Sequence, residues 1–249
     1  MSGWHAPMRL VAAAVVAGGA VAALVALLLY EGVVRFNYPG LDEFPVQGVD
    51  VSHHQGRIDW PLLKGPGVQF AYIKASEGAG FRDADFAANW NGARAAGVVP
   101  GAYHFYTLCK PALLQAGNFL GALAQVSGDG LPPAVDLEFG GNCGQRPTRA
   151  AFDAELAVFI GHLQRGTGGC PLVLYATSEF YEAYLAGSHR PQALWMRDIW
   201  RRPRLDGGEA WTLWQFANRG RLAGVETFID LNVFNGSAAD FAAFRCRRT

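Results

Sequence analysis

Residues 98–139 contain the three segments that decide the fold: Val98–Tyr106 (VVPGAYHFY), Pro111–Val126 (PALLQAGNFLGALAQV) and Pro133–Phe139 (PAVDLEF). The first and third are short apolar runs, which are typical of buried strands. In the middle segment apolar residues recur every three or four positions, as an amphipathic helix requires. This order of strand, helix and strand predicts two parallel strands joined by a crossover helix.

The same alternation extends in both directions along the chain. Helical patterns recur at Asp83–Ala96 and Thr148–Gln164, and Gly97 is placed to end the first of them. We predict an α/β fold, an irregular (β/α)8-type (TIM-like) barrel, with an open doubly wound sheet as the alternative. The barrel is expected to be irregular because less helix separates the later strands. Eight short apolar runs predict strands at Val46–Ser52, Val68–Ser76, Val98–Tyr106, Pro133–Phe139, Pro171–Ser178, Ala193–Trp200, Trp211–Ala217 and Phe228–Phe234.

The N-terminus differs in composition from the rest of the chain. Leu10 to Leu29 carries no charge, and twenty residues of helix span roughly 30 Å, the thickness of a bilayer core. We predict a short N-terminal segment at 1–9, a transmembrane signal-anchor at 10–30, a linker at 31–45 and a folded domain at 46–249. A cleaved signal peptide is the alternative for the apolar run.

Overall composition limits the choice of partners. The chain has 249 residues, of which 51% are hydrophobic, enough for one large core, and we expect a monomer. Its 21 basic and 21 acidic residues form no long run of one sign, so we expect no nucleic-acid partner. The four cysteines lack the C-x-x-C spacing of a zinc site and form either two disulfides or four separate thiols.

Polar residues accumulate where the predicted strands end. In a barrel of this type the carboxyl ends of the strands carry the chemistry, and a charged side chain there is costly unless it is paired or used. The residues in question are Asp50, Lys74, Glu77, His104, Tyr106, Asp136, Glu138, Tyr175, Arg197, Gln215 and Asp230.

Asp136 and Glu138 form the most informative of these pairs. Residues two apart on a strand point to the same side, so both carboxylates would face one pocket. Two close carboxylates do not both ionise easily, and a carboxyl group that stays protonated near neutral pH protonates a departing glycosidic oxygen. The second Asp-x-Glu triplet, at Asp153 and Glu155, lies in a helical pattern, where residues two apart diverge.

Two other interpretations of the pair remain open at this stage. One is a salt-bridged pair at a strand end, without a catalytic role. The other is a metal site built from the pair with Asp50, His53, His54 and His104. Aromatic residues near the strand ends favour a sugar-binding groove, since flat rings stack on sugars: Trp60, Tyr72, Trp90, Tyr103, Phe105, Tyr106, Tyr175, Trp195, Trp211, Trp214 and Phe216.

Several motifs together resemble glycoside hydrolase family 25, the Chalaropsis-type lysozymes. They run in the family order over residues 46–236, and their combination is highly specific. The matching pieces are Gly48-Val49-Asp50-Val51-Ser52 with Gln55-Gly56, Tyr72-Ile73-Lys74-Ala75-Ser76-Glu77-Gly78, Gly101-Ala102-Tyr103-His104-Phe105, Asp136-Leu137-Glu138, Trp214-Gln215-Phe216 and Ile229-Asp230-Leu231-Asn232.

The resemblance implies an N-acetylmuramidase that hydrolyses the β-1,4 bond between N-acetylmuramic acid and N-acetylglucosamine in peptidoglycan, without a metal or cofactor. By position, Glu138 resembles the general acid/base and Asp136 the neighbour that assists the reacting sugar. Asp50 and Asp230 match the other acidic residues of the family pocket. Substrate-binding candidates are Lys74, Glu77, Tyr103, His104, Tyr106, Tyr175, Trp195, Trp214 and Gln215.

The reaction path has two candidates. No obvious carboxylate nucleophile emerges, so we hypothesise that the 2-acetamido group of the substrate attacks with help from Asp136; an inverting route remains open. A catalytically inactive envelope protein that binds peptidoglycan is the alternative function.

The chain also differs from familiar secreted members of the family. We expect an N-terminal anchor and no added wall-binding module, and Arg197 stands where the family usually has a smaller residue. We therefore expect a membrane-anchored protein with an extracytoplasmic domain, or a secreted one if the N-terminal segment is cleaved.

The disulfide pairing is predicted from barrel topology. Cys109 and Cys143 follow the third and fourth strands, which are neighbours in a barrel, so we predict a bridge between them. Cys170 and Cys246 are then left as the second pair.

Overall fold

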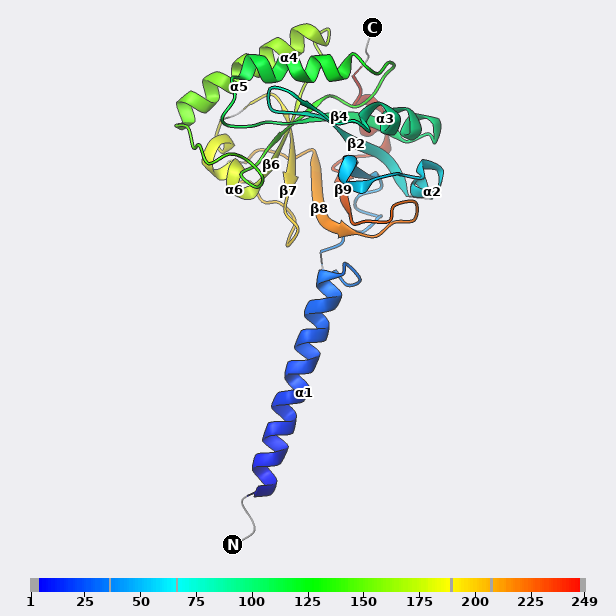
Figure 1. The fold of residues 1–249 in the computed structure, drawn as a ribbon, viewed down its shortest axis with the longest axis vertical. Coiled ribbons are helices and arrows are strands. Elements are labelled where there is room, and N and C mark those ends of the chain that lie inside the picture. The colour runs from blue at the N-terminus through cyan, green and yellow to red at the C-terminus, as the bar shows by residue number, and fades with distance from the viewer. Residues whose placement is uncertain (1–4, 36, 66, 189, 207, 247–249) are drawn as a thin grey trace. The chain divides into compact units, whose positions relative to one another are not determined.

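The computed structural model describes residues 5–35, 37–65, 67–188, 190–206 and 208–246, and the chain divides into two compact units, Met1–Phe36 and Asn37–Thr249. Figure 1 shows the strands and the helices around them. The elements are α1 (His5–Tyr30), β1 (Gln47–Val51), η1 (His53–Gln55), α2 (Trp60–Lys64), β2 (Val68–Glu77), β3 (Phe81–Arg82), α3 (Phe86–Ala95), β4 (Val99–Phe105), α4 (Ala112–Leu123), β5 (Ala134–Leu137), α5 (Arg149–Gly166), β6 (Val173–Thr177), α6 (Ser178–Phe180), η2 (Tyr181–Leu185), β7 (Ala193–Arg197), β8 (Leu213–Gly220), β9 (Ile229–Phe234) and α7 (Ala238–Ala243).

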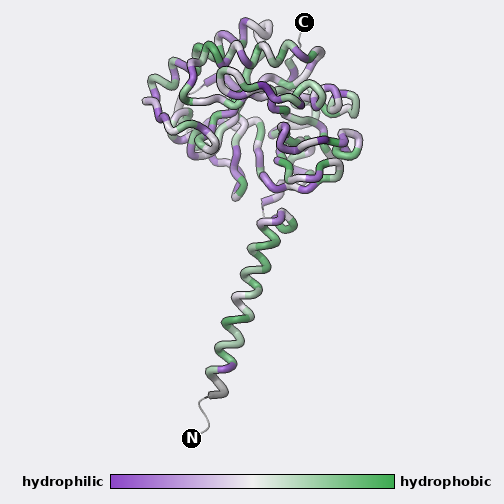
Figure 2. The backbone as a smooth tube through the Cα atoms, in the orientation of Figure 1, coloured by the Kyte–Doolittle hydropathy of each residue, from purple (hydrophilic) through white to green (hydrophobic). Residues whose placement is uncertain are grey.

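The first unit is the apolar helix α1. Its segment Met8–Tyr30 has 23 residues and a mean hydropathy of 2.6, and at the usual rise per residue it is about 35 Å long, enough to cross a bilayer. Figure 2 shows this helix as a largely hydrophobic stretch. A signal sequence near the N-terminus can be as long and as apolar as a membrane anchor, and the helix is consistent with both.

The second unit is a closed barrel of eight strands. The strand order is β1-β9-β8-β7-β6-β5-β4-β2, and the pairing of β1 with β2 closes the barrel, while the short β3 adds to β2 as a hairpin. Each of the eight predicted runs overlaps one barrel strand, and the predicted α/β barrel is confirmed. The helical patterns predicted at Asp83–Ala96 and Thr148–Gln164 are confirmed as well, as α3 and α5.

The direction of one strand differs from the predicted parallel sheet. β9 pairs antiparallel with both β8 and β1. Only residues 221–228 connect β8 to β9, and these residues form no helix. A parallel return needs a crossover of a dozen residues or more, so this short connection can only make a hairpin.

Alternation along the strands separates two cores. Outward side chains such as Ile73, Leu137 and Val233 pack against the helices, of which α4 and α5 lie side by side. Inward side chains fill the barrel itself. The inner core consists of Val46, Phe70, Tyr72, Leu131, Ala134, Val173, Tyr175, Trp195, Leu213, Phe234 and Phe241.

The predicted linker is shorter than expected, because residues from Asn37 onwards belong to the folded unit. The Asn37 side chain donates hydrogen bonds to the carbonyl oxygens of Ile199 (2.6 Å) and Phe216 (2.9 Å). Tyr38 packs edge-on against Phe216, and Phe44 is only 1% exposed. The turn-forming composition of residues 31–45 did not indicate that Tyr38 and Phe44 pack against the barrel. These two residues fix the second half of the segment to it.

Both predicted disulfides are present. Cys109–Cys143 joins the loops that follow β4 and β5, with 6.3 Å between the Cα atoms. Cys170–Cys246 joins the segment before β6 to the chain after α7, with 5.5 Å between the Cα atoms. The first bridge therefore lies at the carboxyl ends of the strands and the second at their amino ends.

Candidate active site

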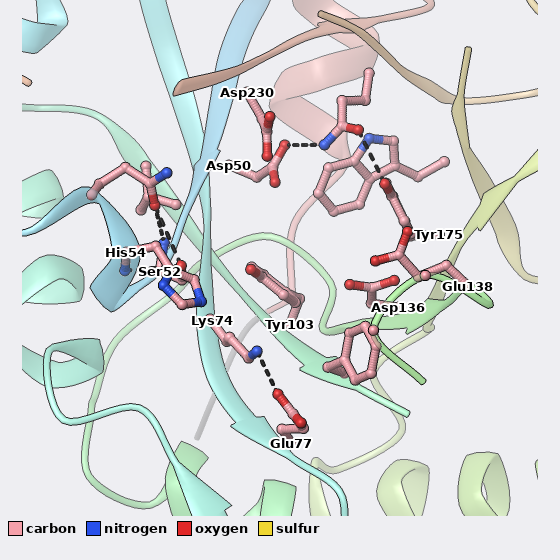
Figure 3. A pocket seen from close by; sticks show the side chains of 17 residues that line it. Asp50, Ser52, His54, Lys74, Glu77, Tyr103, Asp136, Glu138, Tyr175 and Asp230 are labelled. Atoms are coloured by element: carbon pink, nitrogen blue, oxygen red, sulfur yellow. Dashed lines mark hydrogen bonds and ion pairs between the residues drawn. The ribbon is translucent and has the colours of Figure 1, made fainter. Parts of the chain in front are cut away.

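A pocket of about 430 Å³ opens where the parallel strands end (Figure 3). An adjoining hollow of about 560 Å³ shares Glu138, Tyr175, Gln215 and Asp230 with it and adds Arg197. The two therefore form one continuous depression. The residues that line the pocket are Asp50, Val51, Ser52, His54, Gln55, Lys74, Glu77, Tyr103, Phe105, Asp136, Glu138, Gly140, Gly141, Tyr175, Trp195, Gln215 and Asp230.

Strand alternation explains how β5 presents two acids to this pocket. Asp136 lies on β5 and Glu138 just beyond its end, two residues on, while Leu137 between them is buried against the helices. Figure 3 shows the carboxyl groups of Asp136 and Glu138 close together on one side of the pocket, near the Tyr175 hydroxyl. The predicted convergence of the two carboxyl groups is present in the structure.

A bulge in β2 brings Lys74 and Glu77 to the same side. Lys74 pairs with Tyr103 of β4 and Ser76 with His104, so Ala75 is an extra residue in the ladder. On a regular strand, residues three apart face opposite sides, and a bulge reverses that relation. Lys74 Nζ consequently donates to Glu77 Oε2 at 2.7 Å inside the pocket.

Asp230 reaches the pocket because β9 runs antiparallel to its neighbours. We expected Asp230 at the end of a strand, but it is the second residue of β9. Since β9 is antiparallel to its neighbours, its beginning lies level with the ends of the parallel strands. Asp230 is there directly opposite Asp50 of β1, and a side-chain hydrogen bond links the two carboxyl groups.

A chain of hydrogen bonds fixes Asp50. Its Oδ2 accepts from Gln215 Nε2 at 2.8 Å and from Asn232 Nδ2 at 2.7 Å. Gln215 in turn accepts from the Tyr175 hydroxyl at 3.0 Å, and Asn232 accepts from Trp195 Nε1 at 2.8 Å. Because two amides donate to Asp50, its carboxylate form is the better acceptor, and Asp230 is the partner that retains a proton.

Burial is the main cause of the raised pKa values of four carboxyl groups in the pocket, those of Asp50, Asp136, Glu138 and Asp230. It raises the pKa of Asp136 and Asp230 well above the usual range, and the charges of Glu138 on Asp136 and of Asp50 on Asp230 raise them further. Burial also raises the pKa of Glu138 and of Asp50, although Arg197 opposes the first change and the amide hydrogen bonds oppose the second. The pocket thus retains protons at a pH where exposed carboxyl groups have lost theirs.

One oxygen of Asp136 has no partner in the described part of the protein. Asp136 Oδ1 is buried and makes no hydrogen bond there. A buried polar atom without a partner costs about 1–3 kcal/mol, so a ligand that donates a hydrogen bond to this atom recovers that cost. The site is therefore prepared for an N–H or O–H donor beside Asp136.

Three predicted substrate-binding residues lie outside the pocket. His104 is 0% exposed, stacks on Phe119 and hydrogen-bonds Ser76 Oγ through Nδ1 at 2.8 Å, and burial lowers its pKa to about 3. Tyr106 packs against Phe159 in the same outer core.

Trp214 also faces outward, where it contacts Phe44 and donates to the carbonyl oxygen of Asp198 at 2.8 Å. The reason is the same in all three cases, because each is adjacent in sequence to an inward-facing residue. The inward positions are Tyr103 and Phe105 on β4 and Gln215 on β8. A motif identifies the strand, but only alternation assigns the face.

The residues proposed for a metal site do not converge. His53 pairs with Asp83, with 2.8 Å between Nδ1 and Oδ2, and His104 is in the outer core. Across the described residues, no group of three or more His, Cys, Asp or Glu side chains is arranged to hold a metal ion.

Two residues that complete the site were not among the predicted catalytic or substrate-binding residues, and His54 was considered only as a metal ligand. Asn232, fully buried between Trp195 and Asp50, was recognised only as part of a motif, and its spacing of two from Asp230 is the signal that places it on the same face. His54 lines the pocket from the short helix η1, which no periodicity indicated.

The remaining predicted residues do surround the pocket. These are Asp50, Lys74, Glu77, Tyr103, Asp136, Glu138, Tyr175, Trp195, Gln215 and Asp230.

Comparison with known proteins gives a consistent result. The model of "Glycosyl hydrolases family 25" matches residues 49–225. The chain is similar to Lysozyme M1 of Streptomyces globisporus, with 33% identity over 214 residues, 81% of this chain and 72% of that protein. It is equally similar to the uncharacterized protein YegX of Escherichia coli O157:H7, with 33% identity over 81% of this chain and 74% of that protein.

Among solved structures, a family 25 glycosyl hydrolase from Bacillus anthracis superposes with a TM-score of 0.76 at 34% identity, and the match covers 85% of this chain and 98% of the other. The family match includes Asp50, Asp136, Glu138 and Arg197. The barrel, the acidic pocket at its carboxyl end and these similarities agree: the chain belongs to glycosyl hydrolase family 25.

Proposed function

We propose that this protein is a lysozyme-type N-acetylmuramidase that hydrolyses the β-1,4 bond between N-acetylmuramic acid and N-acetylglucosamine in peptidoglycan. The observation that carries the proposal is the shared pocket of Asp136 and Glu138, in which burial raises the pKa of both carboxyl groups. Such a carboxyl group is able to protonate a leaving glycosidic oxygen. The similarity to Lysozyme M1 supports the same substrate.

In this mechanism Glu138 is the general acid. It protonates the leaving oxygen of N-acetylglucosamine while the carbonyl oxygen of the substrate's 2-acetamido group attacks C1 of the muramic residue. Asp136 accepts the acetamido N–H through Oδ1, the oxygen without a partner, and stabilises the positive charge that the group acquires. Water then attacks C1, Glu138 accepts its proton, and the anomeric configuration is retained.

Replacement of Glu138 tests the enzyme function. Glu138→Gln keeps the shape of the side chain and removes its proton transfer, so release of new reducing ends from purified peptidoglycan should fall by about 10²–10⁴-fold. Glu179→Gln is the matched control, because Glu179 is exposed and lies outside the pocket. If the wild-type protein binds peptidoglycan but releases no reducing ends, the protein is an inactive envelope-binding protein instead.

The anomer formed first tests the role of the acetamido group. NMR of a muramic-terminated oligosaccharide during hydrolysis should show the β anomer before mutarotation. An α anomer as the initial product would replace this mechanism with an inverting one, in which an aspartate activates water.

We further propose that α1 anchors the protein in a membrane and that the catalytic unit acts outside the cytoplasm. The length and hydropathy of Met8–Tyr30 support the anchor. The two disulfides support an oxidising compartment. Recovery of the full-length chain from the membrane fraction after an alkaline wash supports the anchor, whereas a soluble chain that begins after α1 indicates a cleaved signal.

A further inference from the structure

Arg197 is positioned at the rim of the pocket by strand alternation. Trp195 of β7 faces the barrel interior and is 2% exposed, so Arg197, two residues further along, faces the same side one level higher. Arg197 pairs in register with Gln215 of β8 and lines the hollow that adjoins the pocket, together with Glu138 and Tyr175. The guanidinium therefore stands beside the proposed general acid.

Arg197 is a cation without a bound partner among the described residues. Lys74, the other cation of the pocket, is already held by Glu77 at 2.7 Å. Asp198 is adjacent to Arg197 in sequence, but its oxygens accept from the backbone N–H groups of Trp200 and Arg201 and approach Arg201 Nε at 3.5 Å. Arg197 makes no ion pair or hydrogen bond with the described side chains, so its donors are available to a ligand.

An anionic ligand needs such a cation here. Besides Glu77, which is paired with Lys74, the pocket contains four carboxyl groups, and any of them that is ionised repels an approaching anion. The charge of Arg197 acts on Asp50, Asp136, Glu138 and Asp230 alike, which places it within electrostatic reach of the whole cluster. A guanidinium also matches a carboxylate with two parallel hydrogen bonds.

We propose, on the basis of the muramidase function above, that Arg197 binds a carboxylate on the substituent of the muramic residue and so makes the pocket selective for anionic over neutral N-acetylated glycans. Muramic acid differs from N-acetylglucosamine by a lactyl ether. That ether ends in a carboxylate, or continues into a peptide that carries carboxylates of its own. Both sources present the same group, and Arg197 is a substrate-binding residue that does not take part in proton transfer.

The test compares three substrates with the full-length protein in detergent. They are peptide-free glycan strands with the lactyl carboxylate, the same strands after methyl esterification, and strands with peptides. Arg197→Ala should lower kcat/KM on the carboxylate-bearing strands by about 10- to 100-fold, the range for hydrogen bonds to charged groups. The change should appear mainly in KM, and activity on the esterified strands should change less than about twofold, within the effect of a weak surface pair.

Control variants separate this role from a general effect of charge. Arg197→Lys should lose less activity than Arg197→Ala, because lysine keeps the positive charge but cannot form the two parallel hydrogen bonds of a guanidinium. Arg201→Ala, in the loop that follows β7 and with a side chain that is 82% exposed, should behave as wild type. A loss confined to peptide-free strands identifies the lactyl group as the source of the carboxylate, and a loss confined to peptide-bearing strands identifies the peptide.

Equal losses on esterified and carboxylate-bearing strands, or no loss on either, would overturn the proposal. Calorimetric binding of the same strands to Glu138→Gln and to the double variant Glu138→Gln/Arg197→Ala gives the answer without turnover. The binding difference should shrink as salt increases. If the wild type cleaves none of the strands, the muramidase function fails, while the binding comparison still tests Arg197.

Discussion

The interior of the barrel has two layers built on the same strands, and they differ in what they contribute. In the lower layer Phe70, Tyr72 and Leu213 form an apolar core. In the upper layer the same strands, continued by two or four residues, present Lys74 and Gln215 to the pocket. The same strands thus position both layers. How far along its strand a residue lies decides whether it contributes to the stability of the fold or to the chemistry of the pocket.

The two layers have opposite effects on the free energy of unfolding. The lower layer removes apolar surface from water, which stabilises the fold. The upper layer buries carboxyl groups, which is costly unless each group is paired or protonated. Tyr175 and Trp195 connect the layers, since they belong to the apolar core and also donate hydrogen bonds to Gln215 and Asn232.

The largest effect is expected from the lower layer. Trp195→Ala removes a ring that stacks on Tyr72 with 4.6 Å between centroids, and it leaves Asn232 without its donor. Truncation of a buried Trp costs about 3–5 kcal/mol of stability, to be measured by chemical denaturation. Trp200→Ala, at a residue that is 67% exposed, should change stability by less than about 0.5 kcal/mol. Equal effects of the two substitutions would mean that Trp195 contributes no more to the core than a surface residue does.

The upper layer should respond in activity and not in stability. Asp136→Asn keeps the size of the side chain but replaces a buried carboxyl group, one oxygen of which has no partner among the described residues, by an amide. Hydrolysis of peptidoglycan should fall by about 10²–10³-fold, the effect of losing one preorganised polar group, while the midpoint of denaturation stays the same or rises. Asp153→Asn, in the other Asp-x-Glu triplet on α5, should keep full activity. A large loss of stability in Asp136→Asn would contradict the separation of the two layers.

The pH dependence of stability gives the smallest and most specific difference. Burial raises the pKa of Asp136 above its unfolded value, so the folded state binds more protons than the unfolded state between these two values. Its contribution to stability is therefore present below the unfolded pKa and is lost as pH rises through the folded pKa, by about 1.4 kcal/mol for each tenfold difference in proton affinity between the two states. Asp136→Asn should gain stability relative to wild type as pH increases from 4 to 8. A constant difference between the two proteins across this range would rule out a raised pKa at Asp136.

The sequence predicted the strands better than it predicted which side chains face the pocket. The apolar runs predicted every barrel strand, because buried strands need continuous apolar residues. The same runs do not distinguish inward from outward positions, and this is why His104 and Trp214 were wrongly assigned to the pocket. Motifs identified Asp136 and Glu138 correctly as a converging pair, since a spacing of two on a strand fixes a common side.

Other features depended on connections or contacts outside the segment concerned. The direction of β9 depends on the length of its connection to β8, and the composition of Phe228–Phe234 is equally compatible with a parallel strand. The docking of Tyr38 and Phe44 depends on Phe216 and Trp211, far along the chain. The availability of Arg197 depends on the pairing of its neighbour Asp198 with Arg201, which the sequence alone does not indicate.

The bulge at Ala75 has a consequence for insertions and deletions. Beyond this residue, β2 continues in the opposite phase, so that Ser76 meets His104 in the outer core while Glu77 meets Lys74 in the pocket. Loss of one residue here would exchange the two faces: a glutamate would enter the apolar layer beneath α4, and a serine would replace it beside Lys74. A change of length in this segment should therefore be more damaging than any single substitution, because it misplaces the residues of both faces at once.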